Sequence, residues 1–348
     1  QWRVRRGSEA YLTRVHGAFG QQLNLVAQFF AEPWTTPRDD LTPGDRAWLL
    51  SSAAFCMTAL GRLSDSVEPR RAGLEMRIAQ EKWPNAAIAG GELAGTLLTL
   101  GRVDEAVETA EAAVRHADHS RDDEQPELRR SDLAAALTAA GNLDRAAALF
   151  AEAEAIDQNA PQLYSLRGYQ YGDLLLARGA AAEALDRGRY QLDLAERFLG
   201  QGLGLDDIGF GHLLIGRAQD ALGDADASGS LDDAVAGLRK SGLSQFVPAA
   251  LLARAAHLRV RAAAGEAGLI EAIHTDLDEV ADIAGEEMER YLTDLALERA
   301  RLALDVPAAV RDASETAAAQ TARAAELIAK TGYHRRDGEL AALQARLG

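Results

Sequence analysis

Two histidines of this sequence have a spacing that could serve a metal ion. His116 and His119 stand three residues apart in a segment with helical periodicity, and Asp118 lies between them. Two imidazoles on one helix face can supply part of a zinc coordination shell. The same pattern also fits two solvated histidines near a helix C-terminus, where the helix dipole favours positive charge. We favour this second interpretation and predict no metal site.

The glycine-rich stretch at residues 200–204 could suggest a phosphate-binding loop. Gly200, Gly202 and Gly204 alternate with other residues, but the third glycine of a dinucleotide-binding fingerprint is missing and no strand is expected before them. The chain also lacks a P-loop, an H-E-x-x-H pair and a G-x-S-x-G elbow. We therefore predict a loop between helices and no bound cofactor.

Two pairs of neighbouring carboxylates could act in general acid–base catalysis. Asp206 and Asp207 precede one expected helix, and Glu286 and Glu287 precede another. Negative charge at a helix N-terminus is stabilised by the helix dipole. That electrostatic role explains both pairs without catalysis, so the sequence predicts that this protein is not an enzyme.

The elements that would position these residues are helical hairpins that recur along the chain. A glycine marks the turn of each hairpin, because glycine adopts positive φ without steric cost and so can end a helix. Successive turns are separated by 40, 40, 38, 44 and 42 residues. Such a period is typical of stacked helical hairpins. The turn glycines are Gly61, Gly101, Gly141, Gly179, Gly223 and Gly265.

The residues around each turn glycine also repeat. An apolar residue lies two positions after it, as at Leu63, Val103 and Leu143, and an acidic residue follows. Small residues lie seven positions before the glycine and five after it, as at Ala94 and Ala106, and let facing helices approach closely. Apolar residues spaced by three, four and seven positions predict helix throughout. The expected fold class is all-α, an α-solenoid of antiparallel helical hairpins.

This combination resembles the tetratricopeptide repeat family. The resemblance rests on the small residue of the first helix, the G-x-(apolar)-[DE]-x-A turn and the small residue that opens the second helix. It implies a right-handed superhelix whose concave surface is lined by the first helix of each hairpin. The units are longer than the usual length of about 34 residues. The sixth unit departs from the pattern, because Leu258 and Ile270 replace the small residues.

Three parts are expected along the chain. Residues 1–44 form an N-terminal helix, expected at 8–31, and a proline-rich loop. Residues 45–284 form six hairpins of the tetratricopeptide kind. Residues 285–348 form a further hairpin, which turns at residues 305–307, and a last helix at 339–347 that caps the array.

The composition limits the partners of the protein. Its formal net charge of −16 argues against nucleic acids and anionic membrane surfaces, since both attract basic proteins. We expect no secretory signal and no membrane span, because no apolar stretch is long enough. Cys56 is the single cysteine, and its neighbours Phe55 and Met57 predict a buried thiol. One cysteine excludes an internal disulfide and fits a reducing cytoplasm.

The tetratricopeptide resemblance also selects residues for the concave surface. Counting back 13, 10, 6 and 3 positions from each turn glycine gives the inner side of each first helix. In the fourth to sixth hairpins this rule selects aromatic and charged residues, which commonly anchor interfaces. It therefore predicts a protein or peptide ligand on this surface. The candidate binding residues are Tyr169, Asp173, Phe210, Arg217, Asp220 and Arg259.

Three segments resemble more specifically the tetratricopeptide tails of bacterial STAND-type NTPases, which are NLR-like signal-transduction ATPases. These segments are residues 163–176, 254–261 and 331–337. The resemblance implies that the array is the ligand-sensing C-terminal part of a larger signalling protein, used in antiviral defence or in transcriptional regulation. An NTPase module of the same protein would then be an intramolecular partner. We expect residues 333–337 to dock the final helices rather than to bind a ligand.

Two other interpretations stay open. The chain could be a free-standing adaptor, although its start at Gln1 in an expected helical region favours a piece of a longer protein. It could also be the inducer-binding domain of a transcriptional regulator and hold a small molecule inside the superhelix. A superhelix closed tightly around an apolar pocket would favour this last alternative. Catalysis in such a pocket has no convergent residues to support it.

Overall fold

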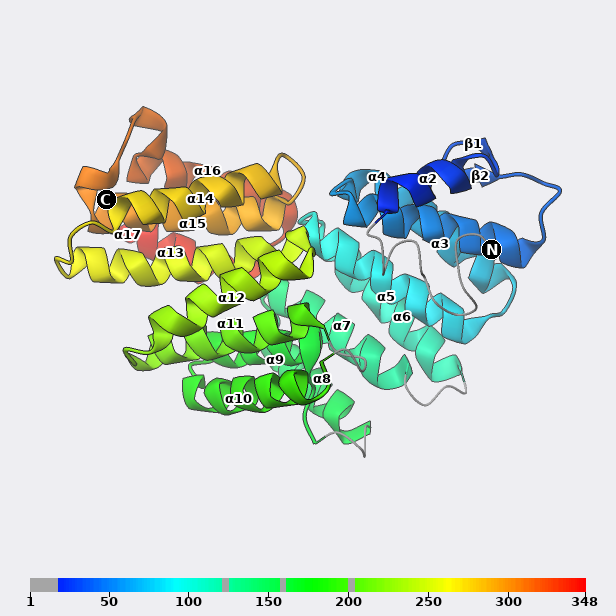
Figure 1. Cartoon of the computed structure of the whole chain (residues 1–348), viewed down its shortest axis with the longest axis horizontal. Coiled ribbons are helices and arrows are strands. Elements are labelled where there is room, and N and C mark those ends of the chain that lie inside the picture. The colour runs from blue at the N-terminus through cyan, green and yellow to red at the C-terminus, as the bar shows by residue number, and fades with distance from the viewer. Residues whose placement is uncertain (1–17, 121–124, 157–160, 200–203) are drawn as a thin grey trace.

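The structure is a computed structural model that describes residues 18–120, 125–156, 161–199 and 204–348. Within these residues the chain forms 16 α-helices, which confirms the all-α fold class. Consecutive helices pack against each other along the whole array (Figure 1). The long helices pair into seven hairpins, α3–α4, α5–α6, α7–α8, α9–α10, α11–α12, α13–α14 and α15–α16.

The elements have the following bounds. The α-helices are α2 (Phe19–Ala27), α3 (Pro43–Ala59), α4 (Leu63–Ala79), α5 (Trp83–Thr99), α6 (Val103–His119), α7 (Gln125–Ala139), α8 (Leu143–Ile156), α9 (Ser165–Ala177), α10 (Ala181–Arg197), α11 (Leu205–Leu222), α12 (Ala227–Ser241), α13 (Val247–Ala263), α14 (Ile270–Ala284), α15 (Glu289–Asp305), α16 (Ala317–Thr331) and α17 (Asp337–Leu347). The short elements are β1 (Phe30–Glu32), β2 (Thr36–Pro37) and the 3-10 helices η1 (Ser244–Phe246), η2 (Pro307–Ala309), η3 (Ala313–Glu315) and η4 (His334–Arg336).

The prediction for the N-terminal residues was partly wrong. Residues 8–17 of the expected helix lie outside the described residues, and α2 ends at Ala27 rather than at residue 31. Strands β1 and β2 then form an antiparallel pair where a helix end and a loop were expected. Pro33 explains the difference, because proline cannot continue a helix and biases the residue before it toward extended backbone. The pair buries Phe30, whose ring centroid lies 5.5 Å from that of Trp34.

The six turn glycines adopt the predicted conformation. Their φ angles lie between 72° at Gly223 and 97° at Gly265, in the left-handed region that favours glycine. The small residues on the facing helices are buried, and Ala94 and Ala106 are 2% and 0% exposed. At Gly172 a side chain is excluded, since a Cβ there would lie 2.4 Å from Leu214. The repeat pattern therefore encodes both the turns and the close packing of neighbouring helices.

The array closes on itself. The C-terminal hairpin α15–α16 and η4 contact the turns of the second and third hairpins, far away in sequence (Figure 1). A Cβ added at Gly101 would lie 2.8 Å from Thr331 Cγ2 and 3.0 Å from Glu289 Cβ. A Cβ at Gly141 would lie 3.3 Å from the carbonyl carbon of His334. The seven hairpins therefore form a solenoid whose C-terminal hairpin packs against the early hairpins, and we call this arrangement the closed ring.

A carboxylate from the C-terminal part completes the first hairpin. Helix α4 has no side-chain cap of its own, and the backbone N–H groups of Leu63 and Ser64 donate to Glu287 Oε2 at 3.1 and 3.2 Å. The sequence interpretation of Glu287 as a helix-start charge was right in kind but named the wrong helix. The carboxylate caps α4, 224 residues away from it, rather than the adjacent α15.

Replacing Glu287 by alanine is expected to lower the free energy of unfolding by about 1 kcal/mol, because two helix N–H groups lose their acceptor and the dipole loses a charge. Chemical denaturation followed by circular dichroism measures this effect. The matched control is Glu286→Ala, which removes the same charge from an exposed neighbour and should change stability by less than about 0.5 kcal/mol. Equal losses in both variants would show that capping is not the cause.

None of the helices in the described ranges is both long enough and apolar enough to cross a membrane.

Candidate functional site

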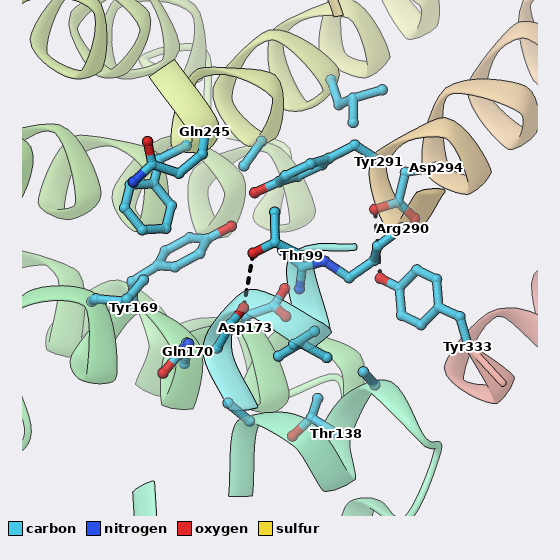
Figure 2. Close-up of a pocket in the computed structure, with 18 of the residues that line it drawn as sticks. Thr99, Thr138, Tyr169, Gln170, Asp173, Gln245, Arg290, Tyr291, Asp294 and Tyr333 are labelled. Carbon is cyan, nitrogen blue, oxygen red and sulfur yellow. Dashed lines mark hydrogen bonds between the residues drawn. The ribbon is translucent and has the colours of Figure 1, made fainter. Parts of the chain in front are cut away.

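The closed ring surrounds a cavity of about 470 Å³. The first helix of every hairpin contributes to the wall, from Thr58 on α3 to Arg301 on α15, together with α4, η1 and the segment at η4. Figure 2 shows that polar groups from α9, α15 and the C-terminal segment are directed into this space. A cavity of this size lies within the range of about 300–1,000 Å³ that is usual for small-molecule sites.

Asp173 on α9 lies between two arginines from distant parts of the chain. Arg217 Nη1 on α11 is 2.7 Å from Asp173 Oδ1. Arg335 of η4 pairs with Asp173 through both of its terminal nitrogens, and its Nη2 also donates to the Asp173 backbone oxygen at 3.2 Å. This ion-pair cluster connects the fourth and fifth hairpins to the C-terminal segment, so it also holds the ring closed.

The electrostatics keep this cluster charged. Burial raises the pKa of the Asp173 carboxyl, but the attraction of Arg335 and Arg217 outweighs burial and holds this pKa well below its usual range. Tyr169 Oη accepts a hydrogen bond from Arg217 Nη1 at 2.9 Å. Burial raises the pKa of Tyr169 to about 12, so its hydroxyl keeps its hydrogen at neutral pH. The cluster therefore offers a carboxylate, two guanidiniums and a neutral phenol.

A second polar cluster belongs to α15 and the segment that follows α16. Arg336 Nε lies 2.7 Å from Asp294 Oδ1, and Tyr333 Oη donates to Asp294 Oδ2 at 3.5 Å. The guanidinium of Arg290 lies 4.9 Å from the ring centroid of Tyr291. Figure 2 shows the Tyr291 hydroxyl and the Arg290 side chain directed toward the Tyr169 hydroxyl. The two clusters thus face the same cavity.

Four of the six predicted binding residues lie together at this cavity. Tyr169, Asp173, Phe210 and Arg217 line it, and the rings of Tyr169 and Phe210 stack with centroids 5.5 Å apart. Arg259 is not among the lining residues, because its guanidinium pairs with Glu298 at 2.6 Å and with Asp305. The counting rule therefore selected two residues of α9 and two of α11 that line the cavity. It did not anticipate that α15 would supply partners for Arg259.

Asp220 also lies outside the cavity wall, in a hydrogen-bonded chain between helices. Asp220 Oδ1 is 2.6 Å from His257 Nδ1, and His257 Nε2 is 2.7 Å from Ser228 Oγ. The order serine, histidine, carboxylate is the one used in nucleophilic catalysis. Here Arg261 Nη1 also donates to Ser228 Oγ at 2.8 Å, which reduces the electron density on that oxygen. We interpret this series of hydrogen bonds as a structural connection between α11, α12 and α13.

The remaining candidates are occupied by packing. His116 stacks on Trp83 with ring centroids 5.6 Å apart, and His119 contacts the same ring edge-on at 4.8 Å. His116 is half-buried, so it is not freely solvated as expected, whereas His119 is exposed. The described part of the chain contains no group of three metal-ligating side chains. Cys56 is buried as predicted, and burial raises the pKa of its thiol to about 11.

The glycine-rich stretch is described only at its end. Gly200 and Gly202 lie outside the described residues, and Gly204 precedes α11. The backbone N–H of Gly204 donates to Asp207 Oδ2 at 2.6 Å. Asp207 thus acts at the start of its own helix, in agreement with the interpretation of the Asp206–Asp207 pair as helix-start charges.

Sequence reasoning missed the contribution of α15 and gave residues 333–337 too narrow a role. Arg290, Tyr291 and Asp294 line the cavity, and so do Tyr333 and Arg335, which were expected only to dock the final helices. Arg335 does both, since it lines the cavity and docks onto Asp173. One signal could have revealed α15, because charged residues recur there at 290, 294, 298 and 301, the spacing of one helix face.

A scan of the sequence against protein-family models finds no match, and a search among curated proteins finds no similar chain.

Proposed function

We propose that this chain is a non-catalytic sensor array that holds a small molecule in the cavity inside its closed ring. The observation that carries the proposal is the cavity of about 470 Å³, to which the first helix of every hairpin contributes. The wall combines segments far apart in sequence, such as Thr58 on α3 and Tyr333 next to η4. An occupant contacts both ends of the array at once, so it stabilises the closed form over any open form.

The same geometry suggests how occupancy is transmitted. Opening the ring breaks the Arg335–Asp173 pair and removes Glu287 from the N-terminus of α4. A ligand that binds the closed ring better than the open one shifts this equilibrium by its difference in affinity. The resemblance to the tails of STAND-type NTPases supports a signalling role in the cytoplasm, in which the ring restrains or releases an NTPase module of the same protein.

A protein or peptide segment is the second candidate ligand. It is favoured by the residue types at the wall, because Tyr169, Phe210 and Arg217 belong to the types that most often anchor protein interfaces. In this version a side chain or a chain end of the partner enters the cavity, and the tetratricopeptide-like hairpins act as a protein-recognition array.

The test uses the intact chain and a fragment library of neutral, cationic and anionic compounds, screened by ligand-observed NMR. Ala253 on α13 lines the cavity, so Ala253→Trp is expected to fill part of it and to abolish the binding of compounds that bind the unsubstituted chain. Ala318→Trp is the matched control, because Ala318 is exposed on α16. The small-molecule proposal is contradicted if no compound binds, or if compounds bind both variants equally.

A further inference from the structure

The cavity wall carries an excess of positive charge within an acidic protein. In the described ranges, six arginines and four carboxylates line it, whereas the whole chain has a formal net charge of −16. Glu339 adds a fifth carboxylate close to the wall, since it pairs with Arg301 and Arg336. After these five carboxylates are set against the six arginines, one positive charge remains at the wall. A local positive charge of this kind attracts an anion, in contrast to the surface as a whole.

Five of the six arginines have carboxylate partners. Arg70 lies 2.8 Å from Glu92, and Arg217 and Arg335 share Asp173. The two others are Arg301 with Glu298 and Arg336 with Asp294.

Arg290 differs from them. Among the described residues it is the one of the six without an ion pair to a carboxylate, although Asp294 and Asp173 attract it from a greater distance. Its Nε finds no hydrogen-bond partner, which is also true of Arg70 Nε. A guanidinium always carries its charge in proteins, and a buried donor without an acceptor is costly. Arg290 is therefore the lining cation best placed to receive a ligand.

Two phenol groups add donors beside Arg290. Tyr169 Oη accepts a hydrogen bond from Arg217 and keeps its own hydrogen at neutral pH. Burial raises the pKa of Tyr291 and outweighs the hydrogen bond from Arg290 that lowers it, so this hydroxyl also stays protonated and its oxygen faces the Arg290 guanidinium. Figure 2 shows both hydroxyls and the Arg290 side chain directed at the same part of the cavity. A guanidinium and two hydroxyls that converge in this way match the oxygens of a carboxylate.

The wall next to these donors is aromatic and apolar. Phe210 stacks on Tyr169, and Phe246 meets Phe210 edge-on with ring centroids 5.1 Å apart. Leu166 and Leu252 extend the same wall. A planar apolar group fits such a surface, because aromatic rings pair favourably in offset-stacked and edge-to-face arrangements.

We propose that the cavity recognises a small aromatic carboxylate, whose carboxylate is bound by Arg290, Tyr169 and Tyr291 and whose ring lies against Phe210 and Phe246. This inference rests on the proposed function and adds the chemical class of the ligand. The remaining charge of one arginine matches a ligand with a single negative charge, which distinguishes a carboxylate from a phosphate monoester of nearly two charges.

Calorimetric titration of the intact chain with 1-naphthoate, 1-naphthamide and 1-naphthyl phosphate tests the inference. Naphthoate is expected to bind at least about tenfold more tightly than the amide, because only the anion pairs with Arg290. Arg290→Gln should weaken naphthoate binding by about tenfold or more and leave amide binding unchanged. Arg290→Lys keeps the charge without the bidentate geometry, so its affinity for naphthoate should lie between those of the unsubstituted chain and Arg290→Gln. The control Arg323→Gln, at an exposed arginine of α16, should bind like the unsubstituted chain.

The outcomes separate this inference from the proposed function. Equal affinities for the carboxylate and the amide, tighter binding of the phosphate, or unchanged binding in a folded Arg290→Gln protein would overturn the assignment of a carboxylate at Arg290. If none of the three probes binds, while library compounds bind the unsubstituted chain and not Ala253→Trp, the anion inference is wrong and the small-molecule site stands. Circular dichroism confirms that each variant is folded.

Discussion

Replacing Asp173 by asparagine is expected to lower the free energy of unfolding by about 3–5 kcal/mol, because it leaves two largely buried guanidiniums without their shared counter-charge. Arg217 lies 2.7 Å from this carboxylate, and the side chain of its second partner, Arg335, is only 9% exposed. The side chains are nearly the same size, so the loss arises from charge rather than from packing. Chemical denaturation followed by circular dichroism at pH 7 measures it.

The matched control is Asp232→Asn on α12. Asp232 lies 2.9 Å from Arg254, but 65% of its side chain is exposed, so its ion pair contributes less than about 1 kcal/mol. If Asp173→Asn costs no more than Asp232→Asn, the Asp173 cluster does not hold the ring closed.

The pH dependence of stability follows from the same carboxylate. The pKa of Asp173 in the folded protein lies well below its value in the unfolded chain, which is about 4. The unfolded state therefore takes up a proton first as the pH falls, and the stabilisation that is complete above about pH 4 is lost progressively on further acidification. Below pH 4 the unsubstituted chain should lose stability more steeply than Asp173→Asn.

Replacing Gly101 by alanine is expected to open the ring and to lower the free energy of unfolding by about 2–5 kcal/mol. Part of this loss, about 1–2 kcal/mol, comes from placing a Cβ at a φ of +81°. The rest comes from the collision of that Cβ with Thr331 Cγ2 at 2.8 Å and Glu289 Cβ at 3.0 Å, since overpacking of this kind costs about 1–3 kcal/mol. A larger radius of gyration in small-angle X-ray scattering would report the opening.

Gly179→Ala separates the two contributions. Gly179 has a φ of +77°, but a Cβ there would meet no atom within 4 Å. This variant should lose only the backbone contribution of about 1–2 kcal/mol and keep the radius of gyration of the unsubstituted chain. A similar change of shape in both variants would mean that the turn at Gly101 does not hold the C-terminal hairpin.

The hairpins were predictable because their signals are local. Each turn glycine and each small residue acts on helices that are neighbours in sequence, so a period of about 40 residues carries the information. Gly172 illustrates this, because it must be small to accommodate Leu214 of the next hairpin. Tyr169, Asp173, Phe210 and Arg217 could be placed at the inner wall for the same reason.

The ring closure and half of the wall were not predictable in this way. The Arg335–Asp173 pair joins residues 162 positions apart, and it depends on a curvature that accumulates over many hairpins. No single hairpin determines this accumulated curvature, so Arg290 and Arg335 could not be placed in the cavity by counting from turn glycines. The β1–β2 pair was missed for a different reason, because two prolines locally override an otherwise helical composition.

The cap that Glu287 provides to α4 has a consequence for the synthesis of the protein. A ribosome must add 224 residues after Leu63 before this carboxylate exists. At about 5–20 residues per second, the first hairpin waits roughly 10–45 s for its acceptor. During that interval the early hairpins lack both their cap and the C-terminal segment that later covers the turn at Gly101. Chaperones, or other copies of this chain, can therefore reach surfaces of the nascent array that the finished ring conceals.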